Sequence, residues 1–233
     1  MTDKPIIFSG PMIRALLDGQ KTQTRRVLKP QPEERANGLW HVFNRYGGSA
    51  GVHVDQVGEV AADYAPWRSG DRLWVRETCG RRTASFLGIE ATNGVEEAFY
   101  VADGEDVVNE HEFNLRPWWR GKVCPSIHMP RLASRLTLIV EAVKVERLQE
   151  ISYEDAILEG VGDFAKALGD STNEPTGETA EQTARRLQWP QRAFSALWKE
   201  IHGPDAWAAN PWVAAIRFRV VAANIDAISG EQP

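Results

Sequence analysis

Three stretches of this chain carry hydrophobic residues at the spacing of a helix. Residues 11–18 begin with proline, which the first turn of a helix tolerates, and Gly19 follows where a left-handed cap is favoured. Residues 152–160 begin with a serine N-cap and acidic residues and end at a glycine. Residues 191–201 follow Pro190 and carry an apolar stripe that is typical of core packing. We therefore predict a helix over each of these stretches.

Other stretches alternate hydrophobic and polar residues, as half-buried strands do. They are residues 71–78, 136–145 and 212–221, and the short apolar run 6–8 also predicts a strand. Residues 136–145 form the longest β-branched run of the chain, which predicts a central strand. In residues 71–78 the alternation places Glu77 on the same side as apolar residues. Helices and strands together predict an α+β fold.

The segments between these elements are rich in turn-forming residues. Residues 33–66 contain many glycine, asparagine and aspartate residues with only a weak alternation, so we expect an insertion loop with marginal strands. Residues 80–120 are expected to form a second insertion, with a small hairpin around residues 98–101. Residues 162–188 predict a third, a loop followed by a short helix at residues 179–187.

A dense run of polar residues follows the first predicted helix, and we interpret it as a turn. Residues 19–26 read Gly-Gln-Lys-Thr-Gln-Thr-Arg-Arg. The run supplies an amine, hydroxyls and guanidinium groups within a short segment. Such a concentration of reactive and cationic groups is a candidate functional site, and the alternative is a basic, threonine-rich turn after a helix with no site, which occurs in many proteins.

Read as Gly-x-Lys-x-x-Thr-x-Arg, this run resembles the signature of the ASCH superfamily, whose small β-barrels are similar to the PUA domains that bind RNA. The matching residues are Gly19, Lys21, Thr24 and Arg26. Further segments resemble ASCH segments in the same order, and they are residues 69–77, 135–147, 151–160 and 211–218. The whole set resembles the larger ASCH proteins that bacteriophages and prophages encode. The resemblance implies one ASCH-like domain over residues 1–233, a PUA-like β-barrel flanked by helices and interrupted by the three insertions.

The resemblance also implies a set of catalytic residues. In small ASCH proteins that hydrolyse N4-acetylcytidine, catalysis is assigned to a lysine and a threonine of the motif and to a glutamate in the helix after the long strand. These positions correspond to Lys21, Thr24 and Glu159. The implied activity is an amidohydrolase that removes the acyl group from N4-acylated cytosine nucleosides or bases.

The chemistry of this activity makes demands on the lysine. A threonine hydroxyl is a poor nucleophile unless a base takes its proton, and a lysine can do so only if its pKa is lowered. Arg25 and Arg26 are neighbouring cations that favour such a shift. The spacing of Lys21 and Thr24 brings their side chains together in a helical or tight-turn backbone but not in an extended one. Glu159 would orient the lysine or carry a proton to the leaving amine.

The same residues also fit functions of other classes. A non-catalytic module could grip phosphate with the lysine, threonine and arginines and read a base of RNA or modified DNA. A ribonuclease is a further alternative, because lysine, arginine and glutamate can support phosphodiester cleavage. Glu159 distinguishes the non-catalytic module from the hydrolase, because catalysis needs this carboxylate whereas a phosphate-binding site should avoid one.

Residues outside the catalytic set are candidates for holding the ligand, which we expect to be a modified cytidine or a nucleic-acid base. They are Arg25, Arg26, Glu77 and Trp119. Trp119 lies among basic residues, and an aromatic face with cations nearby can stack a base, although a buried tryptophan at the root of a loop is an alternative. For Glu77 the alternative is a strand end, where the carboxylate reaches water or an arginine.

Composition adds few constraints. The chain has 233 residues, of which 42% are hydrophobic, which is enough for a core without disulfides, and we expect Cys79 and Cys124 to be buried thiols. The net charge of −5 argues weakly against general nucleic-acid binding, although residues 116–140 contain basic and no acidic residues. No phosphate-binding loop, dinucleotide motif or metal-ligand spacing is visible, so we expect no cofactor and no metal.

The sequence also bears on the location of the protein. No apolar run approaches the roughly 20 residues that cross a bilayer, and the N-terminal residues lack a secretory pattern. We therefore expect a cytoplasmic protein without a membrane partner. Nothing in the sequence indicates the oligomeric state.

Overall fold

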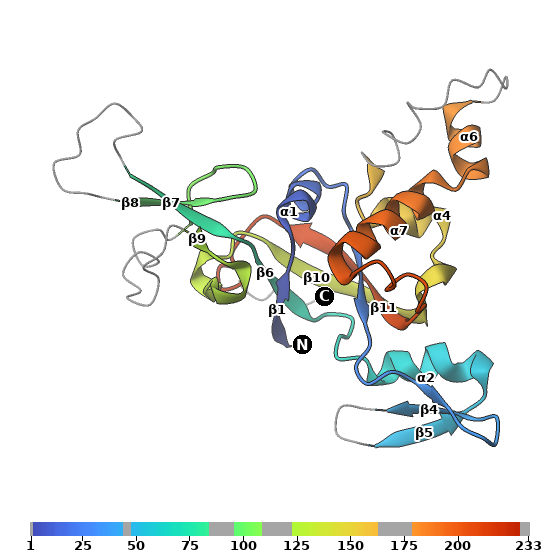
Figure 1. Ribbon diagram of the computed structural model, residues 1–233. Coiled ribbons are helices and arrows are strands. Elements are labelled where there is room, and N and C mark those ends of the chain that lie inside the picture. Colours follow the sequence, from blue (N-terminus) through green and yellow to red (C-terminus); the bar gives the residue numbers. More distant parts are fainter. Residues whose placement is uncertain (1, 44–47, 84–95, 109–122, 163–178, 229–233) are drawn as a thin grey trace. The chain divides into compact units, whose positions relative to one another are not determined.

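The structure is a computed structural model that describes residues 2–43, 48–83, 96–108, 123–162 and 179–228 (Figure 1). Over these ranges the chain forms five α-helices and three β-sheets, which confirms the α+β class. None of the sheets in these ranges closes into a barrel. The chain divides into two compact units. The first consists of Met1–Gly19, Gly70–Val140 and Arg219–Pro233, and the second of Gln20–Ser69 and Glu141–Phe218.

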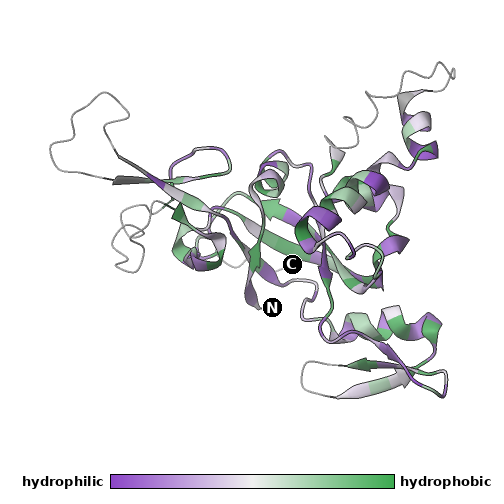
Figure 2. Cartoon of the chain, in the orientation of Figure 1, coloured by the Kyte–Doolittle hydropathy of each residue, from purple (hydrophilic) through white to green (hydrophobic). Residues whose placement is uncertain are grey.

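The largest sheet has five strands in the order β1-β6-β10-β11-β2. Its strands are β1 (Asp3–Ile7), β2 (Gln23–Val27), β6 (Arg72–Arg76), β10 (Thr137–Arg147) and β11 (Trp212–Val221). β1 runs parallel to β6, whereas β10 is antiparallel to β6 and β11 is antiparallel to β2. The central position of the long β10 strand is the one predicted from its β-branched run. Figure 2 shows β11 as largely hydrophobic, as expected for a strand that is buried over Trp212–Ile216.

Besides β1 and β6, the first unit contains helix α1 and a small sheet. α1 (Gly10–Leu17) buries Ile13 and Leu16 of its predicted apolar face, whereas Leu17 is exposed. Gly19 follows with a φ of +70°, a conformation that suits glycine. The small sheet has the order β8-β7-β9, with bounds Cys79–Thr83 for β7, Glu96–Tyr100 for β8 and Val123–Cys124 for β9. Cys79 and Cys124 face each other across β7 and β9 as free, buried thiols, as predicted.

Asp3 at the start of β1 is held by two arginines. The Nε and Nη2 atoms of Arg72 donate to the two carboxylate oxygens of Asp3 at 2.8 Å each, and Arg131 Nη2 donates at 2.6 Å. These hydrogen bonds, that of Arg72 first, hold the pKa of Asp3 below its ordinary value although burial opposes the shift. The ionised carboxylate therefore stabilises the folded state.

We expect Asp3→Asn to lower the free energy of unfolding at pH 7 by roughly 1 kcal/mol or less, because the pair is partly exposed. A carboxyl whose folded pKa is depressed contributes stability above its unfolded pKa and loses it at lower pH, so the difference from wild type should shrink below about pH 4. Urea unfolding at several pH values measures this difference. The exposed Asp205→Asn variant serves as the control, and a difference that persists unchanged at pH 3 would contradict the prediction.

In the second unit, the segment predicted as an insertion loop is more regular than expected. Residues 33–66 form a sheet of order β3-β4-β5, with bounds Glu33–Glu34, Trp40–Phe43 and Ser49–Val52, followed by helix α2 (Val57–Tyr64). Helix α2 was not predicted because its apolar face is short, with only Val57 and Ala61 buried. Gly58 fits this helix against β10, since a Cβ atom there would meet the Val145 carbonyl oxygen at 2.7 Å.

Over the described residues, the second unit contains three further helices, of which α4 and α7 contribute residues to its buried core. They are α4 (Tyr153–Leu158), α6 (Ala180–Arg186) and α7 (Trp189–His202), close to the predicted bounds. The Ser152 side chain caps α4 by accepting a hydrogen bond from the Asp155 N–H at 3.0 Å, as predicted. Phe194 and Trp198 of α7 pack with residues of α4 and β11 in one buried cluster. This packing fixes the end of α4 beside β2.

Candidate active site

The backbone around Lys21 joins three elements of the second unit. The Thr22 N–H donates to the Leu158 carbonyl at the end of α4 at 2.9 Å, and the Phe218 N–H of β11 donates to the Thr22 carbonyl at 2.9 Å. Lys21 itself forms an isolated antiparallel bridge with Glu159. Residues 21–22 are thus held between the last turn of α4 and strand β11. These backbone contacts set the position of the Lys21 side chain.

The Lys21 side chain is fully buried and binds Glu159 twice. Its Nζ atom donates to Glu159 Oε2 at 2.9 Å and to the Glu159 carbonyl oxygen at 2.8 Å, and the Glu159 side chain is only 3% exposed. The two residues lie 138 positions apart in the chain. Glu159 is the C-cap of α4, where the helix dipole disfavours an anion. The cations beside it offset this unfavourable position.

Arg25 is the second cation of the site, and it contacts three carboxylates. Its Nη1 atom donates to Glu159 Oε1 at 3.0 Å, and its Nη2 atom donates to Glu146 Oε1 at 2.5 Å and to Asp155 Oδ2 at 3.0 Å. The guanidinium also lies over the Phe194 ring, with 5.7 Å from its Cζ atom to the centroid. Together, Lys21, Arg25, Glu146, Asp155 and Glu159 form what we call the Lys21 cluster.

Burial and charge act in opposite directions on the cations of this site. Burial lowers the pKa of Lys21, with smaller contributions from Arg26 and Arg25, whereas Glu159 opposes the shift, so the net direction is downward. Burial also lowers the pKa of Arg26, and Glu159 again opposes it. For Arg25, burial is outweighed by Glu159, Glu146 and Asp155, and the pKa is raised. The cluster therefore contains one firmly charged guanidinium and one amine that is easier to deprotonate than a free lysine.

Thr24 does not lie where the turn interpretation placed it. Residues 23–27 form strand β2, in which Thr24 pairs with Ile216 of β11, so the predicted turn is wrong. Lys21 and Arg25 both reach Glu159 from one side of this extended segment, and alternation places Thr24 on the other side. Thr24 is buried, and its hydroxyl makes no hydrogen bond within the described part of the chain.

The strand was hidden in the sequence because its side chains are polar. Gln23, Thr24 and Arg25 are all buried, but the charge of Arg25 is balanced by carboxylates from distant elements. A pattern of hydrophobic positions cannot reveal such a strand, since long-range ion pairs replace apolar contacts.

The other predicted ligand-binding residues are placed differently. Arg26 is partly buried, and it contributes with burial to lowering the pKa of His202 on α7. Glu77 belongs to the first unit and binds the guanidinium of Arg135 with both carboxylate oxygens, each at 2.9 Å. This pairing agrees with the alternative to ligand binding by Glu77, in which a carboxylate at a strand end contacts an arginine. Trp119 lies outside the described residues.

Glu146 and Asp155 are site residues that were not predicted. Asp155 stands four residues before Glu159, a spacing that places two side chains on one side of a helix, and this was an available signal. For Glu146, at the end of β10, the sequence offers no comparable signal. Its partner Arg25 is 121 positions away, and only the fold brings them together.

In comparisons with protein-family models, curated proteins and solved structures, no match to this chain is found. The ASCH resemblance therefore remains an expectation from the sequence. Among the residues that the structure describes, no helix combines the length and apolar character needed to cross a bilayer. Within the same ranges, no group of three or more His, Cys, Asp or Glu side chains is placed to hold a metal ion.

Proposed function

We propose that this protein is an amidohydrolase that removes the acyl group from N4-acylated cytosine nucleosides or bases, with Lys21, Thr24 and Glu159 as its catalytic residues. The observation that supports this proposal is the buried contact of 2.9 Å between Lys21 Nζ and Glu159 Oε2. This contact joins the Gly-x-Lys-x-x-Thr-x-Arg motif to the helix after the long strand. In the ASCH resemblance, the catalytic residues come from these two segments. We also propose that the fold is of the ASCH type, related to the PUA-like barrel.

In the proposed reaction, Thr24 Oγ1 attacks the acyl carbonyl carbon and loses its proton. The bond between that carbon and N4 of cytosine then breaks, N4 takes up a proton to become the free amine, and an ester on Thr24 remains. A water molecule hydrolyses the ester, which releases the carboxylate and restores the hydroxyl. The lowered pKa of Lys21 suits a group that accepts and returns the proton in these steps.

The extended backbone changes how the proton travels in this scheme. Lys21 and Thr24 lie on opposite sides of the segment, so the proton passes between them through a water molecule or the substrate rather than directly. Glu159 holds the ammonium form of Lys21 after proton uptake, as its two hydrogen bonds to Nζ indicate.

Lys21 and Arg25 are already paired with carboxylates, and this favours a hydrolase over a phosphate-binding module. Arg25 contacts three carboxylates, and Lys21 is paired with Glu159. A phosphate approaching these cations would have to compete with buried carboxylates and would be repelled by them. Binding of RNA or modified DNA through Lys21 and Arg25 is therefore the weaker hypothesis.

The test is to incubate the purified protein with N4-acetylcytidine and to measure cytidine by chromatography. We expect wild type to release cytidine and acetate in equal amounts, and Lys21→Ala to be slower by about 100-fold or more, the usual contribution of a general base. The exposed Lys29→Ala variant is the matched control and should keep the wild-type rate.

The outcomes separate the proposed classes. No cytidine release from folded wild type, or equal release from folded Lys21→Ala, would contradict the proposal. Cleavage of an added RNA would instead identify a ribonuclease. Binding of RNA or modified DNA without any turnover would identify a binding module.

A further inference from the structure

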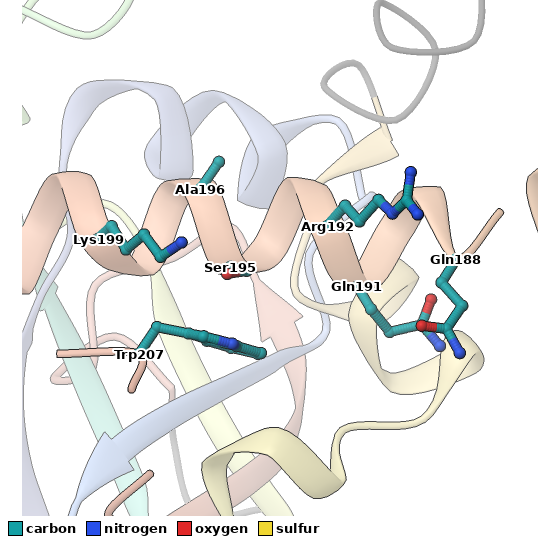
Figure 3. A pocket seen from close by; sticks show the side chains of 7 residues that line it. All are labelled: Gln188, Gln191, Arg192, Ser195, Ala196, Lys199 and Trp207. Atoms are coloured by element: carbon teal, nitrogen blue, oxygen red, sulfur yellow. The ribbon is translucent and has the colours of Figure 1, made fainter. Parts of the chain in front are cut away.

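A pocket of about 440 Å³ lies along helix α7 in the second unit (Figure 3). It is lined mostly by polar side chains of α7, from Gln188 to Lys199, and by Trp207. Figure 3 shows the Trp207 ring below the helix that carries the other side chains. None of the lining residues is buried, so the pocket is an open surface groove that indicates no particular ligand.

The two cysteines of the chain face each other in the small sheet of the first unit. Cys79 on the central strand β7 and Cys124 on β9 are directly opposed partners of an antiparallel pair. Side chains at opposed positions lie on the same face of a sheet, and their Cα atoms are about 4.5 to 5.5 Å apart. A disulfide needs Cα atoms roughly 4.4 to 6.8 Å apart. The backbone therefore places this pair where a disulfide can form without a movement of the strands.

Both thiols are free and fully buried, and they share an apolar cluster with residues such as Ala98, Val107 and Ala133. The Sγ atom of Cys79 lies 3.8 Å from the Glu77 carbonyl oxygen, and that of Cys124 lies 3.8 Å from the Pro125 carbonyl oxygen. A thiol is a weak donor, so these contacts cost little to give up when the two sulfur atoms are joined.

Strand β9 gives an oxidant access to this buried pair. It consists of two residues, Val123 and Cys124, and Val123 is 53% exposed. A short edge strand has few hydrogen bonds to break, so it opens locally at a small part of the cost of global unfolding. Burial raises the pKa of Cys124, whereas Arg76 and Arg81 act in the opposite direction. Opening removes the burial and leaves the two guanidinium groups on β6 and β7, which favours the reactive thiolate.

We propose that Cys79 and Cys124 are a reversible oxidation site, at which a small-molecule disulfide such as oxidised glutathione converts the two thiols into an intramolecular disulfide. The thiolate of Cys124 attacks one sulfur of oxidised glutathione, the S–S bond of glutathione breaks, and one reduced glutathione leaves. As β9 returns to β7, the thiolate of Cys79 attacks Cys124 Sγ and displaces the second reduced glutathione. Two electrons thus pass from the cysteines to the glutathione disulfide, and the released glutathione molecules take up two protons.

The disulfide ties β9 to β7 and closes residues 79–124 into a loop. Reducing conditions keep the pair as the free thiols of this structure, so the cross-link forms only when oxidised glutathione accumulates. The two cysteines belong to the first unit and the Lys21 cluster to the second. The proposal therefore does not depend on the amidohydrolase activity.

The experiment is to incubate the full chain, without denaturant, in an excess of oxidised glutathione until its thiol content is constant. Remaining thiols are then blocked with iodoacetamide, and tryptic peptides are identified by mass spectrometry. We expect both thiols to disappear and the peptides of residues 77–81 and 123–131 to be joined. Dithiothreitol should separate these peptides and restore both thiols.

The same reaction in concentrated urea measures how much the fold favours the cross-link. The equilibrium constant for oxidation by glutathione should be roughly 30- to 1,000-fold larger for the native chain than for the unfolded chain, the fold-change that the usual stabilisation by a disulfide implies. Single variants test the order of the steps. Cys79→Ala should stop at a mixed disulfide between Cys124 and one glutathione, whereas Cys124→Ala should take up glutathione more slowly, because Cys79 lies on the central strand.

Three outcomes would overturn the proposal. The first is a native wild-type chain that keeps both thiols under conditions in which the urea-unfolded chain forms the disulfide. The second is a cross-link between two chains, seen as a dimer in non-reducing electrophoresis. The third is an equal equilibrium constant for the native and unfolded chains, which would mean that the fold does not hold the two thiols opposite each other.

Discussion

Replacing Arg25 with methionine should lower the free energy of unfolding by about 3 to 5 kcal/mol at neutral pH, the usual cost of removing one partner of a buried ion pair. The Arg25 side chain is fully buried and donates to Glu146, Asp155 and Glu159. Methionine fills a similar volume but neutralises none of these carboxylates. Lys144 and Lys21 would remain as partners of Glu146 and Glu159, whereas Asp155 would lose its partner in the cluster.

The loss in the Arg25→Met variant should depend on pH. Without the guanidinium, the ionised carboxylates of the cluster repel one another and lack a counter-charge, and protonation removes this cost, so the penalty grows as pH rises. It should therefore be smallest near pH 4, where glutamate titrates when unfolded, and largest at neutral pH.

Urea unfolding at pH 4 and pH 7 measures both effects. The control is Arg35→Met, which removes a surface ion pair with Glu33 at 3.3 Å and should change stability by less than about 0.5 kcal/mol. Equal, small losses for Arg25→Met and Arg35→Met at pH 7 would show that the Lys21 cluster is not the buried ion network described here.

The second large effect concerns the pair of Lys21 and Glu159. Lys21→Met removes a donor from Glu159, and Glu159→Gln leaves a buried ammonium with a weaker partner, so each variant should lose about 3 kcal/mol of stability. The double variant removes both charges together. Its loss should be smaller than the sum of the single losses by about 1 to 3 kcal/mol, as expected for residues in direct contact.

A double-mutant cycle of unfolding free energies measures this coupling. The same cycle for Arg35 and Glu33 on the surface is the comparison, and its coupling should stay below about 1 kcal/mol. Additive losses for Lys21→Met and Glu159→Gln would mean that the contact between their side chains does not stabilise the fold.

Much of the secondary structure could be predicted because local signals were strong. The cap at Ser152, the proline at the start of α7 and the alternation of residues 212–221 each identified an element that the structure contains. The helix α2 escaped notice because a short face with two buried residues resembles a loop sequence. Strand β2 escaped notice because its buried side chains are polar, and their charge partners are far away in sequence.

The candidate site was predictable only in part. The pairing of Lys21 with Glu159 was expected from the resemblance, in which the glutamate orients the lysine, and the two side chains are in direct contact. The contact of Arg25 with Glu146 could not be foreseen, because Glu146 lies on β10, 121 positions away, and meets Arg25 only in the folded chain. The pocket along α7 was also missed. Its residues occupy the polar side of a helix whose apolar stripe accounts for the core.

The most direct test of the central claim is the rate of cytidine release from N4-acetylcytidine by wild type and by Glu159→Gln. The Glu159 carboxylate is needed by a hydrolase and unfavourable in a phosphate-binding module. Glutamine keeps the size of this side chain while removing its charge. With both proteins shown to be folded by circular dichroism, we expect wild type to turn over and Glu159→Gln to be slower by about 100-fold or more. Equal rates, or no release by wild type, would contradict the account.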